Sequence, residues 1–266
     1  MPLSHSEIKN LRALHAKKGR RTANKFLAEG VRLLEEALRF KQKPARLLYS
    51  LSLLSPRGEQ IVEKFRRLGV TAHQVAAGEL SRICDTEQTQ GLAAVFELHP
   101  RRLSELMGPK TRNVLVCENL SDPGNVGTLI RSALAFGFDA VTLVGRCAET
   151  YSPKVVRSSV GAVFGMPVVS TGLAEVLAER DKYQMTLVAA ALEGSDRIED
   201  VLARTASRPL LLAIGSEADG LSPELIQAAQ EIVRIGHSEN VESLNSAIAG
   251  SILMKECFDF RMRRKA

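Results

Sequence analysis

The sequence contains few cysteines and no apolar run long enough for a membrane helix. Its four cysteines, Cys84, Cys117, Cys147 and Cys257, include no pair spaced as CxxC, and the five histidines do not cluster with them. We therefore expect no metal site and interpret the thiols as small buried side chains in a reducing compartment. No segment approaches the ~20 apolar residues that cross a bilayer. The N-terminus lacks the apolar core of a secretory signal, so we expect a cytoplasmic location without membrane attachment.

Three common signatures of nucleotide and cofactor binding are also missing. The sequence has no G-x-x-x-x-G-K-[ST] loop and no G-x-G-x-x-G after a strand. The first absence argues against a P-loop NTPase and the second against a dinucleotide-binding oxidoreductase. The glycine-rich first loop of conventional Rossmann methyltransferases is absent as well.

Positive charge is concentrated at the front of the chain. Residues 1–46 hold 12 Lys and Arg against 4 Asp and Glu, whereas the other residues hold 24 against 26. Lys17, Lys18, Arg20 and Arg21 lie almost side by side in this segment. Such a segment favours a polyanionic partner, most simply nucleic acid, through phosphate contacts and counterion release. A solvated helix face gives the same pattern, so charge alone leaves both interpretations open.

The length of 266 residues suggests two domains. Helices and strands alternate over residues 1–98, residues 99–112 contain two prolines among basic and polar residues and form the predicted linker, and the alternation resumes over 113–266. Near-continuous apolar strands in the second domain predict a parallel sheet covered on both faces. The predicted helices span residues 5–18, 31–40, 56–68, 126–136, 154–159, 174–179, 223–229 and 244–260, and the predicted strands span 26–30, 46–50, 70–75, 91–98, 113–118, 140–144, 185–192, 210–215 and 231–235, with another beginning at 168.

Three polar loops follow apolar strands in the second domain, where the carboxyl ends of parallel strands are expected to bind ligands. The first contains the turn sequence Asp-Pro-Gly-Asn at residues 122–125. Gly127 permits the close approach of a backbone or ligand, and Arg131, one helical turn further on, can hold a phosphate bidentately. A structural turn followed by a surface arginine would give the same pattern.

The second loop, residues 215–222, places Glu217 and Asp219 between glycines. Ser222 followed by Pro223 predicts the N-cap and first residue of the next helix. The two carboxylates could stabilise the start of that helix, or they could hold an RNA hydroxyl or another ligand. Both interpretations stay open at this point.

The third loop, residues 235–245, leads into the terminal helix, for which Ser243 is the predicted N-cap. Together the three loops resemble the motifs of the SpoU (TrmH) family of SPOUT-superfamily RNA ribose 2′-O-methyltransferases. The matching residues are Asn119, Asp122, Pro123, Asn125, Gly127 and Arg131 of N-x-x-D-P-x-N-x-G-x-x-x-R, Gly215, Glu217, Gly220 and Leu221 of G-x-E-x-x-G-L, and Ser243, Leu244 and Asn245 of S-L-N.

The resemblance covers residues 113 to about 258, and the N-terminal part resembles the family's L30e-like substrate-binding domain more loosely. It implies an α/β fold in which an L30e-like RNA-binding domain precedes a SPOUT domain with a parallel sheet and a deep trefoil knot. It also implies a homodimer and the cofactor S-adenosylmethionine. The implied cofactor-binding residues are Gly215, Ile235 and Leu244, and the implied catalytic residues are Arg131, Asn125, Glu217, Ser243 and Asn245.

The implied role of Arg131 is to contact phosphate and help deprotonate the 2′-hydroxyl. Because arginine normally stays protonated, a literal base would need surroundings that penalise its charge. Arg131 could instead stabilise the developing alkoxide while a phosphate or water takes the proton. The chain departs from the family pattern at Gly236-His237 and Ser246-Ala247, and His237 becomes a candidate substrate contact.

The expected substrate is RNA because DNA lacks a 2′-hydroxyl. The predicted RNA contacts are Lys17, Lys18, Arg20, Arg21 and Arg131. Aromatic residues of the first domain fall within apolar patterns, so we expect recognition of RNA shape and backbone more than base stacking. By analogy with relatives that carry an L30e-like domain, we expect ribosomal RNA. Transfer RNA is one alternative, and a catalytically silent RNA-binding protein on the same fold is another.

Overall fold

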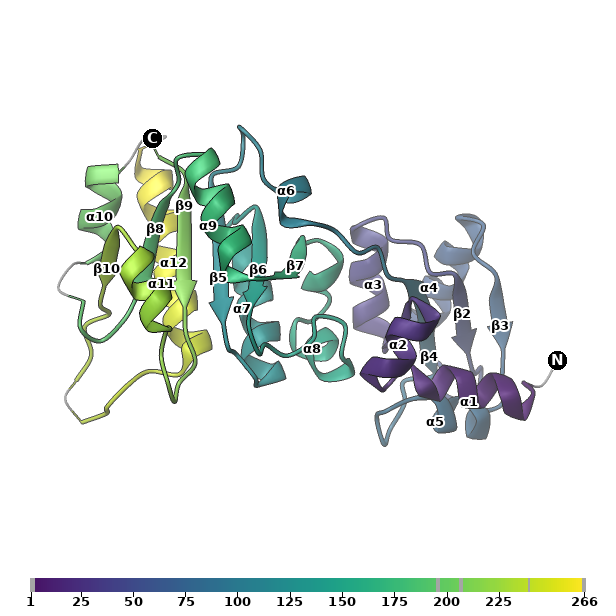
Figure 1. Cartoon of the computed structure of the whole chain (residues 1–266). Coiled ribbons are helices and arrows are strands. Elements are labelled where there is room, and N and C mark those ends of the chain that lie inside the picture. The colour runs from purple at the N-terminus through teal and green to yellow at the C-terminus, as the bar shows by residue number, and fades with distance from the viewer. Residues whose placement is uncertain (1–2, 195–196, 206–207, 239, 265–266) are drawn as a thin grey trace. The chain divides into compact units, whose positions relative to one another are not determined.

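The computed structural model describes residues 3–194, 197–205, 208–238 and 240–264 (Figure 1). The chain forms two compact units, one of residues 1–99 with 149–165 and one of residues 100–148 with 166–266. The first contains a four-stranded sheet and the second a six-stranded sheet. The predicted α/β fold class is confirmed; the knot and the L30e likeness stay predictions.

The sheet of the first unit has the strand order β1-β4-β2-β3. Strand β4 pairs antiparallel with β1 and β2, and β3 runs parallel to β2. Leu34, Ile61 and Phe65 of the covering helices are fully buried. The elements of residues 3–99 are α1 (His5–Ala13), α2 (Lys17–Ala23), β1 (Lys25–Glu29), α3 (Val31–Arg39), β2 (Arg46–Tyr49), α4 (Pro56–Arg67), β3 (Ala72–Gln74), α5 (Ala77–Ile83) and β4 (Leu92–Glu97).

Residues 149–165 belong to the first unit although they lie within the second domain of the sequence. They form α8 (Pro153–Ser158) and the 3₁₀ turn η1 (Ala162–Phe164). The ring of Tyr151 lies 4.6 Å from that of Phe26, and the ring of Phe164 lies 4.8 Å from that of Phe96, between centroids. These aromatic contacts attach the segment to β1 and β4.

The sheet of the second unit has the order β10-β8-β9-β5-β6-β7, and all its pairings are parallel (Figure 1). Its strands are β5 (Asn113–Glu118), β6 (Ala140–Val144), β7 (Val168–Thr171), β8 (Thr186–Ala190), β9 (Leu210–Ile214) and β10 (Glu231–Val233). Its helices are α6 (Leu103–Leu106), α7 (Pro123–Ala135), α9 (Leu173–Lys182), α10 (Ile198–Thr205), α11 (Pro223–Ala228) and α12 (Ser246–Arg263). The parallel register brings the carboxyl ends of these strands to one edge of the sheet.

Helices cover both faces of this sheet, as its apolar strands predict. Residues of α6, α9 and α11 join one core cluster with β5, β8 and β9. On the other face, a Cβ on Gly250 of α12 would lie 2.5 Å from Leu129 of α7 and 3.3 Å from Ile214 of β9. Leu103, in the segment predicted as a linker, is fully buried. None of the helices in the described ranges combines the length and apolarity that a membrane span requires.

Candidate active site

Each of the three motif loops leads into a helix whose first turn is capped by a side chain. Asp122 Oδ2 accepts a hydrogen bond from the Asn125 backbone N–H at 3.2 Å. Ser222 Oγ accepts one from Leu225 N–H at 3.2 Å, which confirms Ser222 as the predicted N-cap of α11. These caps fix where each loop ends.

The predicted N-cap of α12 is wrong. Asn245, not Ser243, caps this helix, and its Oδ1 accepts hydrogen bonds from the backbone N–H groups of Ala247 at 3.0 Å and Ile248 at 3.1 Å. Ser243 lies exposed two residues earlier. Asparagine and serine are equally good caps, so composition could not choose between them.

Side chains from all three motif loops meet in one hydrogen-bonded cluster. Asn125 Nδ2 donates to Glu217 Oε1 at 2.7 Å, and Asn245 Nδ2 donates to the same oxygen at 2.6 Å. Asn245 Nδ2 also lies 3.0 Å from Asn125 Oδ1. The two amides thus orient one carboxylate oxygen of Glu217. We call these three residues the motif cluster.

A buried carboxylate joins the first two motifs behind the motif cluster. Glu118, the last residue of β5, accepts hydrogen bonds from Ser222 N–H at 2.7 Å and Ser222 Oγ–H at 2.8 Å. Glu118 is 4% exposed, so water does not reach its carboxylate. The two charge-assisted hydrogen bonds from Ser222 satisfy the buried carboxylate instead. Ser222 therefore caps α11 and anchors it to the adjacent strand.

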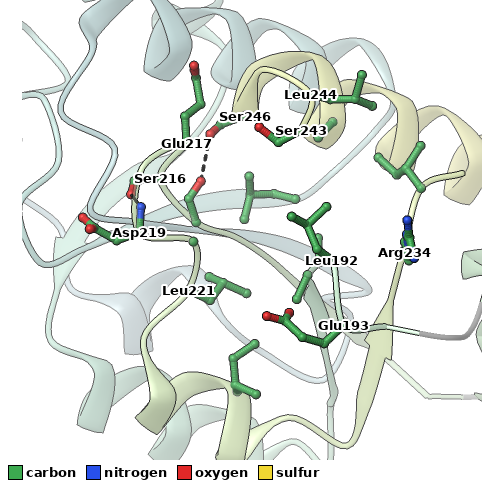
Figure 2. A pocket seen from close by; sticks show the side chains of 18 of the residues that line it. Leu192, Glu193, Ser216, Glu217, Asp219, Leu221, Arg234, Ser243, Leu244 and Ser246 are labelled. Atoms are coloured by element: carbon green, nitrogen blue, oxygen red, sulfur yellow. Dashed lines mark hydrogen bonds between the residues drawn. The ribbon is translucent and has the colours of Figure 1, made fainter. Parts of the chain in front are cut away.

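The second motif closes on itself through its glycines. Ser216 and Gly220 exchange backbone hydrogen bonds at 3.1 and 3.0 Å. A Cβ on Gly215 would lie 2.2 Å from the carbonyl carbon of Gly220, so only glycine fits there. Gly220 has φ +66°, a conformation that glycine adopts without strain. The Gly215 carbonyl accepts a hydrogen bond from buried Ser246 Oγ at 2.9 Å, drawn as a dashed line in Figure 2.

A pocket of about 590 Å³ lies at the carboxyl edge of the sheet. Figure 2 shows Leu192, Leu221 and Leu244 among its walls, together with the carboxylates of Glu193 and Asp219. Apolar walls with a few polar groups and a volume between about 300 and 1,000 Å³ are typical of sites for small molecules.

The structure places the predicted cofactor residues together. Gly215, Ile235 and Leu244 all line the pocket, as do Glu217 and Ser243. Among the described residues, the backbone N–H groups of Ile235 and Leu244 have no backbone partner. They are therefore available to a ligand.

Arg131 lies on the exposed face of α7, outside the motif cluster and outside the pocket lining. Within the described part of the chain, its guanidinium has no hydrogen-bond or ion-pair partner. The neighbouring Leu129 and Ile130 are fully buried, which orients this turn of α7. The arginine is thus held by its helix and presented to solvent.

Sequence reasoning missed the pocket residues that follow β8. Leu192 and Glu193 lie beyond the carboxyl end of this strand, and that position alone could have pointed to them.

His237, a departure from the family pattern, also lines the pocket. Its Nδ1 lies 3.1 Å from the Ser238 carbonyl oxygen, while Nε2 is buried with no partner among the described residues.

The basic residues of α2 fall into two groups. Lys17, Lys18 and Arg21 are exposed. Arg20, which we expected to contact RNA, is 3% exposed and holds Glu149 Oε2 at 2.6 Å and Oε1 at 3.2 Å. Its Nη1 donates to the carbonyls of Leu14 at 2.8 Å and His15 at 2.7 Å. The structure thus gives Arg20 a structural role.

The thiols and the other potential metal ligands are dispersed. All four cysteines are free, with Cys117 and Cys257 buried and Cys84 and Cys147 half-buried. No group of three or more His, Cys, Asp or Glu side chains converges within the ranges that the structure describes.

Fold and site together define a two-unit α/β protein with a ligand pocket at the carboxyl edge of a parallel sheet. The model of the SpoU rRNA Methylase family matches residues 112–255, and that of the MRM3-like substrate binding domain matches residues 5–94. The chain belongs to the SpoU rRNA methylase family, which confirms the resemblance inferred from the three motifs.

Similar proteins cover nearly the whole chain. It is 29% identical to the 23S rRNA (guanosine(2553)-2′-O)-methyltransferase RlmP of Bacillus subtilis, over 94% of this chain and 95% of that protein. It is 30% identical to an uncharacterized tRNA/rRNA methyltransferase of Synechocystis sp., over 94% and 89% of the two chains. A solved structure, the AdoMet-bound rRNA methyltransferase from Sinorhizobium meliloti, has a TM-score of 0.85 at 29% identity and covers 99% of this chain and 98% of that one.

Proposed function

We propose that this chain transfers a methyl group from S-adenosylmethionine to a ribose 2′-hydroxyl of ribosomal RNA. The observation that carries the proposal is the motif cluster, in which Asn125, Glu217 and Asn245 of three separate motifs meet and Glu217 lines the pocket at the carboxyl edge of the sheet. The names of RlmP and of the AdoMet-bound methyltransferase support the reaction and the substrate class.

The pocket residues fit S-adenosylmethionine. Leucine side chains offer apolar walls for an adenine ring. The backbone N–H groups of Ile235 and Leu244, which no described backbone group accepts, can pair with its edge. Glu193 and Asp219 are acceptors for ribose hydroxyls or for an ammonium group. Gly215 allows the second-motif loop to close beside the pocket, because any side chain at this position would clash with Gly220. When bound, the cofactor supplies an electrophilic methyl group on a sulfonium.

The protein's remaining tasks are to align the 2′-hydroxyl and to manage its proton. Holding two reactants in line can supply about 7–11 kcal/mol of the barrier. We assign Arg131 to the phosphate beside the target ribose and to stabilisation of the developing alkoxide, because its guanidinium is exposed and carries no partner among the described residues. The motif cluster, together with Ser243, is assigned to positioning the ribose.

The exposed residues Lys17, Lys18 and Arg21 are assigned to RNA phosphates. In this proposal residues 1–98 form the RNA-binding domain, 99–112 the linker and 113–266 the methyltransferase domain. Residues 149–165 contribute to the first unit from within the last range.

We also propose a cytoplasmic homodimer. Ile248, in the first turn of α12, is 52% exposed, and Val241 just before the helix is 49% exposed. Exposed apolar side chains beside an active site support an interface between two copies. Sedimentation velocity of the wild type and of Ile248→Asp tests this, because a charge at the interface would shift the dimer toward monomer.

The function is tested by incubating the protein with methyl-labelled S-adenosylmethionine and, in separate reactions, unmodified ribosomal RNA and unmodified transfer RNA, followed by nucleoside analysis. We expect a labelled 2′-O-methyl nucleoside from the wild type and from Arg263→Ala, an exposed arginine that pairs with Glu199. Arg131→Ala should lose transfer while cofactor binding, measured by calorimetry, survives. Label in transfer RNA alone would overturn the substrate assignment. No cofactor binding at all would favour a silent RNA-binding protein.

A further inference from the structure

The second unit has another cavity, at the opposite edge of its sheet from the candidate active site. Its volume is about 540 Å³, and it is lined by residues at the amino ends of β5 and β9, by α10 and by the last turns of α12. Strand β9 connects the two places, since Leu210 at its start lines this cavity and Ile214 at its end lines the cofactor pocket. The four intervening steps of the strand separate them by about 13 Å.

Arginines dominate the lining of this cavity. Four of its residues are Arg112, Arg208, Arg261 and Arg264, and none of the described residues that line it is acidic. We call these four residues the arginine cluster. Like charges brought together around a hollow repel one another, so the arrangement is most stable with an anion between them.

One member of the arginine cluster is committed to the fold. Arg261 Nη2 donates to the Phe136 carbonyl at 2.6 Å, and Nη1 donates to the Gly137 carbonyl at 3.3 Å. These bonds satisfy carbonyl groups at the C-terminus of α7, where a positive charge is favourable. Arg261 therefore has a structural reason to be where it is.

The other three arginines have no such reason in the part of the chain that the structure describes. The side chains of Arg112 and Arg208 are exposed and make no ion pair or hydrogen bond with a described residue. Arg264 contacts the ring of Phe260, 5.9 Å from its centroid, and likewise pairs with no described carboxylate. By contrast, Arg263 on the neighbouring position of α12 pairs with Glu199 at 2.6 Å.

The floor of the cavity is apolar, with Leu202, Leu210, Cys257 and Phe260 in its lining. Leu210 and Cys257 are almost completely buried. Walls of low polarity strengthen the field of charges at the rim of a hollow. Planar guanidinium groups match the oxygens of phosphate, which they can bind in pairs.

We propose that the arginine cluster is a phosphate-binding site, distinct from the methyl-transfer site. The phosphate could belong to the backbone of the RNA substrate, held at a second point, or to a small phosphorylated molecule. The RNA source rests on the proposed function; the binding of phosphate itself does not.

Pyrophosphate is the first probe, titrated calorimetrically into the full chain. We compare the wild type with Arg208→Ala/Arg264→Ala and with the matched control Arg197→Ala/Arg263→Ala. The control removes the same charge from two exposed arginines that both pair with Glu199. We expect the wild type and the control to bind pyrophosphate and the cluster variant to lose at least tenfold in affinity. Thermal unfolding of all three establishes that they are folded.

Ribosomal RNA fragments are the second probe, with binding measured at several salt concentrations from about 50 to 200 mM. If the RNA backbone occupies the cluster, the cluster variant should lower the slope of log affinity against log salt by about two relative to the control, one for each lost phosphate contact. An unchanged slope with lost pyrophosphate binding would identify a small phosphorylated molecule as the source. Equal behaviour of the two variants with both probes would overturn the proposal, whatever the outcome of the methylation assay.

Discussion

Glu118 and Ser222 are joined by two hydrogen bonds although 104 residues separate them in the sequence. The carboxylate of Glu118 accepts both the backbone N–H and the hydroxyl of Ser222, while Ser222 Oγ also accepts Leu225 N–H. One serine thus connects the last residue of β5 to the first turn of α11. The loop of the second motif, which precedes Ser222, ends at a fixed point as a result.

Glu118→Ala should lower the free energy of unfolding by about 1–3 kcal/mol, because it leaves two donors of Ser222 without their buried acceptor. It should also weaken cofactor binding, since the second-motif loop loses its anchor. Urea unfolding and calorimetry measure the two effects. Glu224→Ala is the control. It removes an exposed carboxylate from α11 and should change the free energy of unfolding by less than about 0.5 kcal/mol. Equal stability of both variants would contradict the role of the link.

Substitution of Asn245 separates its capping role from its contact with Glu217. Asn245→Ser keeps a cap of similar strength, whereas Asn245→Ala should cost about 1 kcal/mol of stability. Both variants remove the amide that donates to Glu217 at 2.6 Å, so both should reduce methyl transfer. Urea unfolding and the transfer assay are compared. Full activity of Asn245→Ser would show that the amide does not orient Glu217 for the reaction.

Gly215→Ala should prevent the second motif from closing. The new Cβ would lie 2.2 Å from the carbonyl carbon and oxygen of Gly220 and 2.4 Å from the backbone nitrogen of Leu221, and because all three atoms are backbone the loop must move. We expect lost cofactor binding and a lower melting temperature. Gly236→Ala is the matched control, because its Cβ meets no described atom within 4 Å. Cofactor affinity that falls equally in both variants would contradict this account.

Arg20 and its neighbours in α2 should respond differently to substitution. Arg20→Ala leaves Glu149 and two backbone carbonyls without their donor and should cost about 2–4 kcal/mol of stability in the first unit. Lys17→Ala/Lys18→Ala should leave stability unchanged and weaken RNA binding in a salt-dependent way. Thermal unfolding and RNA titrations test both statements. An Arg20→Ala protein as stable as the wild type would contradict the structural role of Arg20 and leave RNA contact as its predicted role.

The thiols should be unreactive in the folded protein. Burial raises the pKa of Cys84 and Cys257 from the usual 9.0 to about 12, and it raises those of Cys117 and Cys147 as well. Because the thiolate is the nucleophile, labelling with a disulfide reagent near pH 8 should be slow until denaturant is added. Fast labelling of the native protein would contradict this.

The same pKa shifts predict a dependence of stability on pH. The folded state keeps these thiols protonated, whereas the unfolded chain ionises them above its usual pKa of 9.0. The free energy of unfolding should therefore fall as the pH rises from about 9 toward 12. Replacement of Cys257 by alanine should reduce that slope in a series of urea unfolding curves.

Much of the fold follows from local sequence signals, and the exceptions have identifiable causes. The pair Ser222-Pro223 marked a helix start because a capping oxygen and a fixed φ act within one turn. The pair Asp122-Pro123 has the same arrangement, but we interpreted residues 122–125 as a turn, and helix α7 begins at Pro123, three residues before the predicted start. Helix α5 was missed because seven residues with two buried positions, Leu80 and Ile83, show too little periodicity. The predicted helix 5–18 is two helices, α1 and α2.

The candidate site was predictable in its members but not in its contacts. The motifs named Asn125, Glu217 and Asn245, yet only the folded structure shows both amides on one oxygen of Glu217. The burial of Arg20 was hidden from the sequence because its partner Glu149 is 129 residues away. Charge density alone cannot separate an arginine that faces solvent from one that holds the fold together.

The attachment of residues 149–165 to the first unit makes the chain pass between the units three times, after residues 99, 148 and 165. A chimera that exchanges the front of this protein with that of a relative at a single junction would divide an aromatic core, with Phe26 and Phe96 from one parent and Tyr151 and Phe164 from the other. Recombination within this family is therefore expected to succeed when the two stretches are inherited together. The segment that follows the second unit's first strands in the chain is, for the purpose of exchange, part of the first unit.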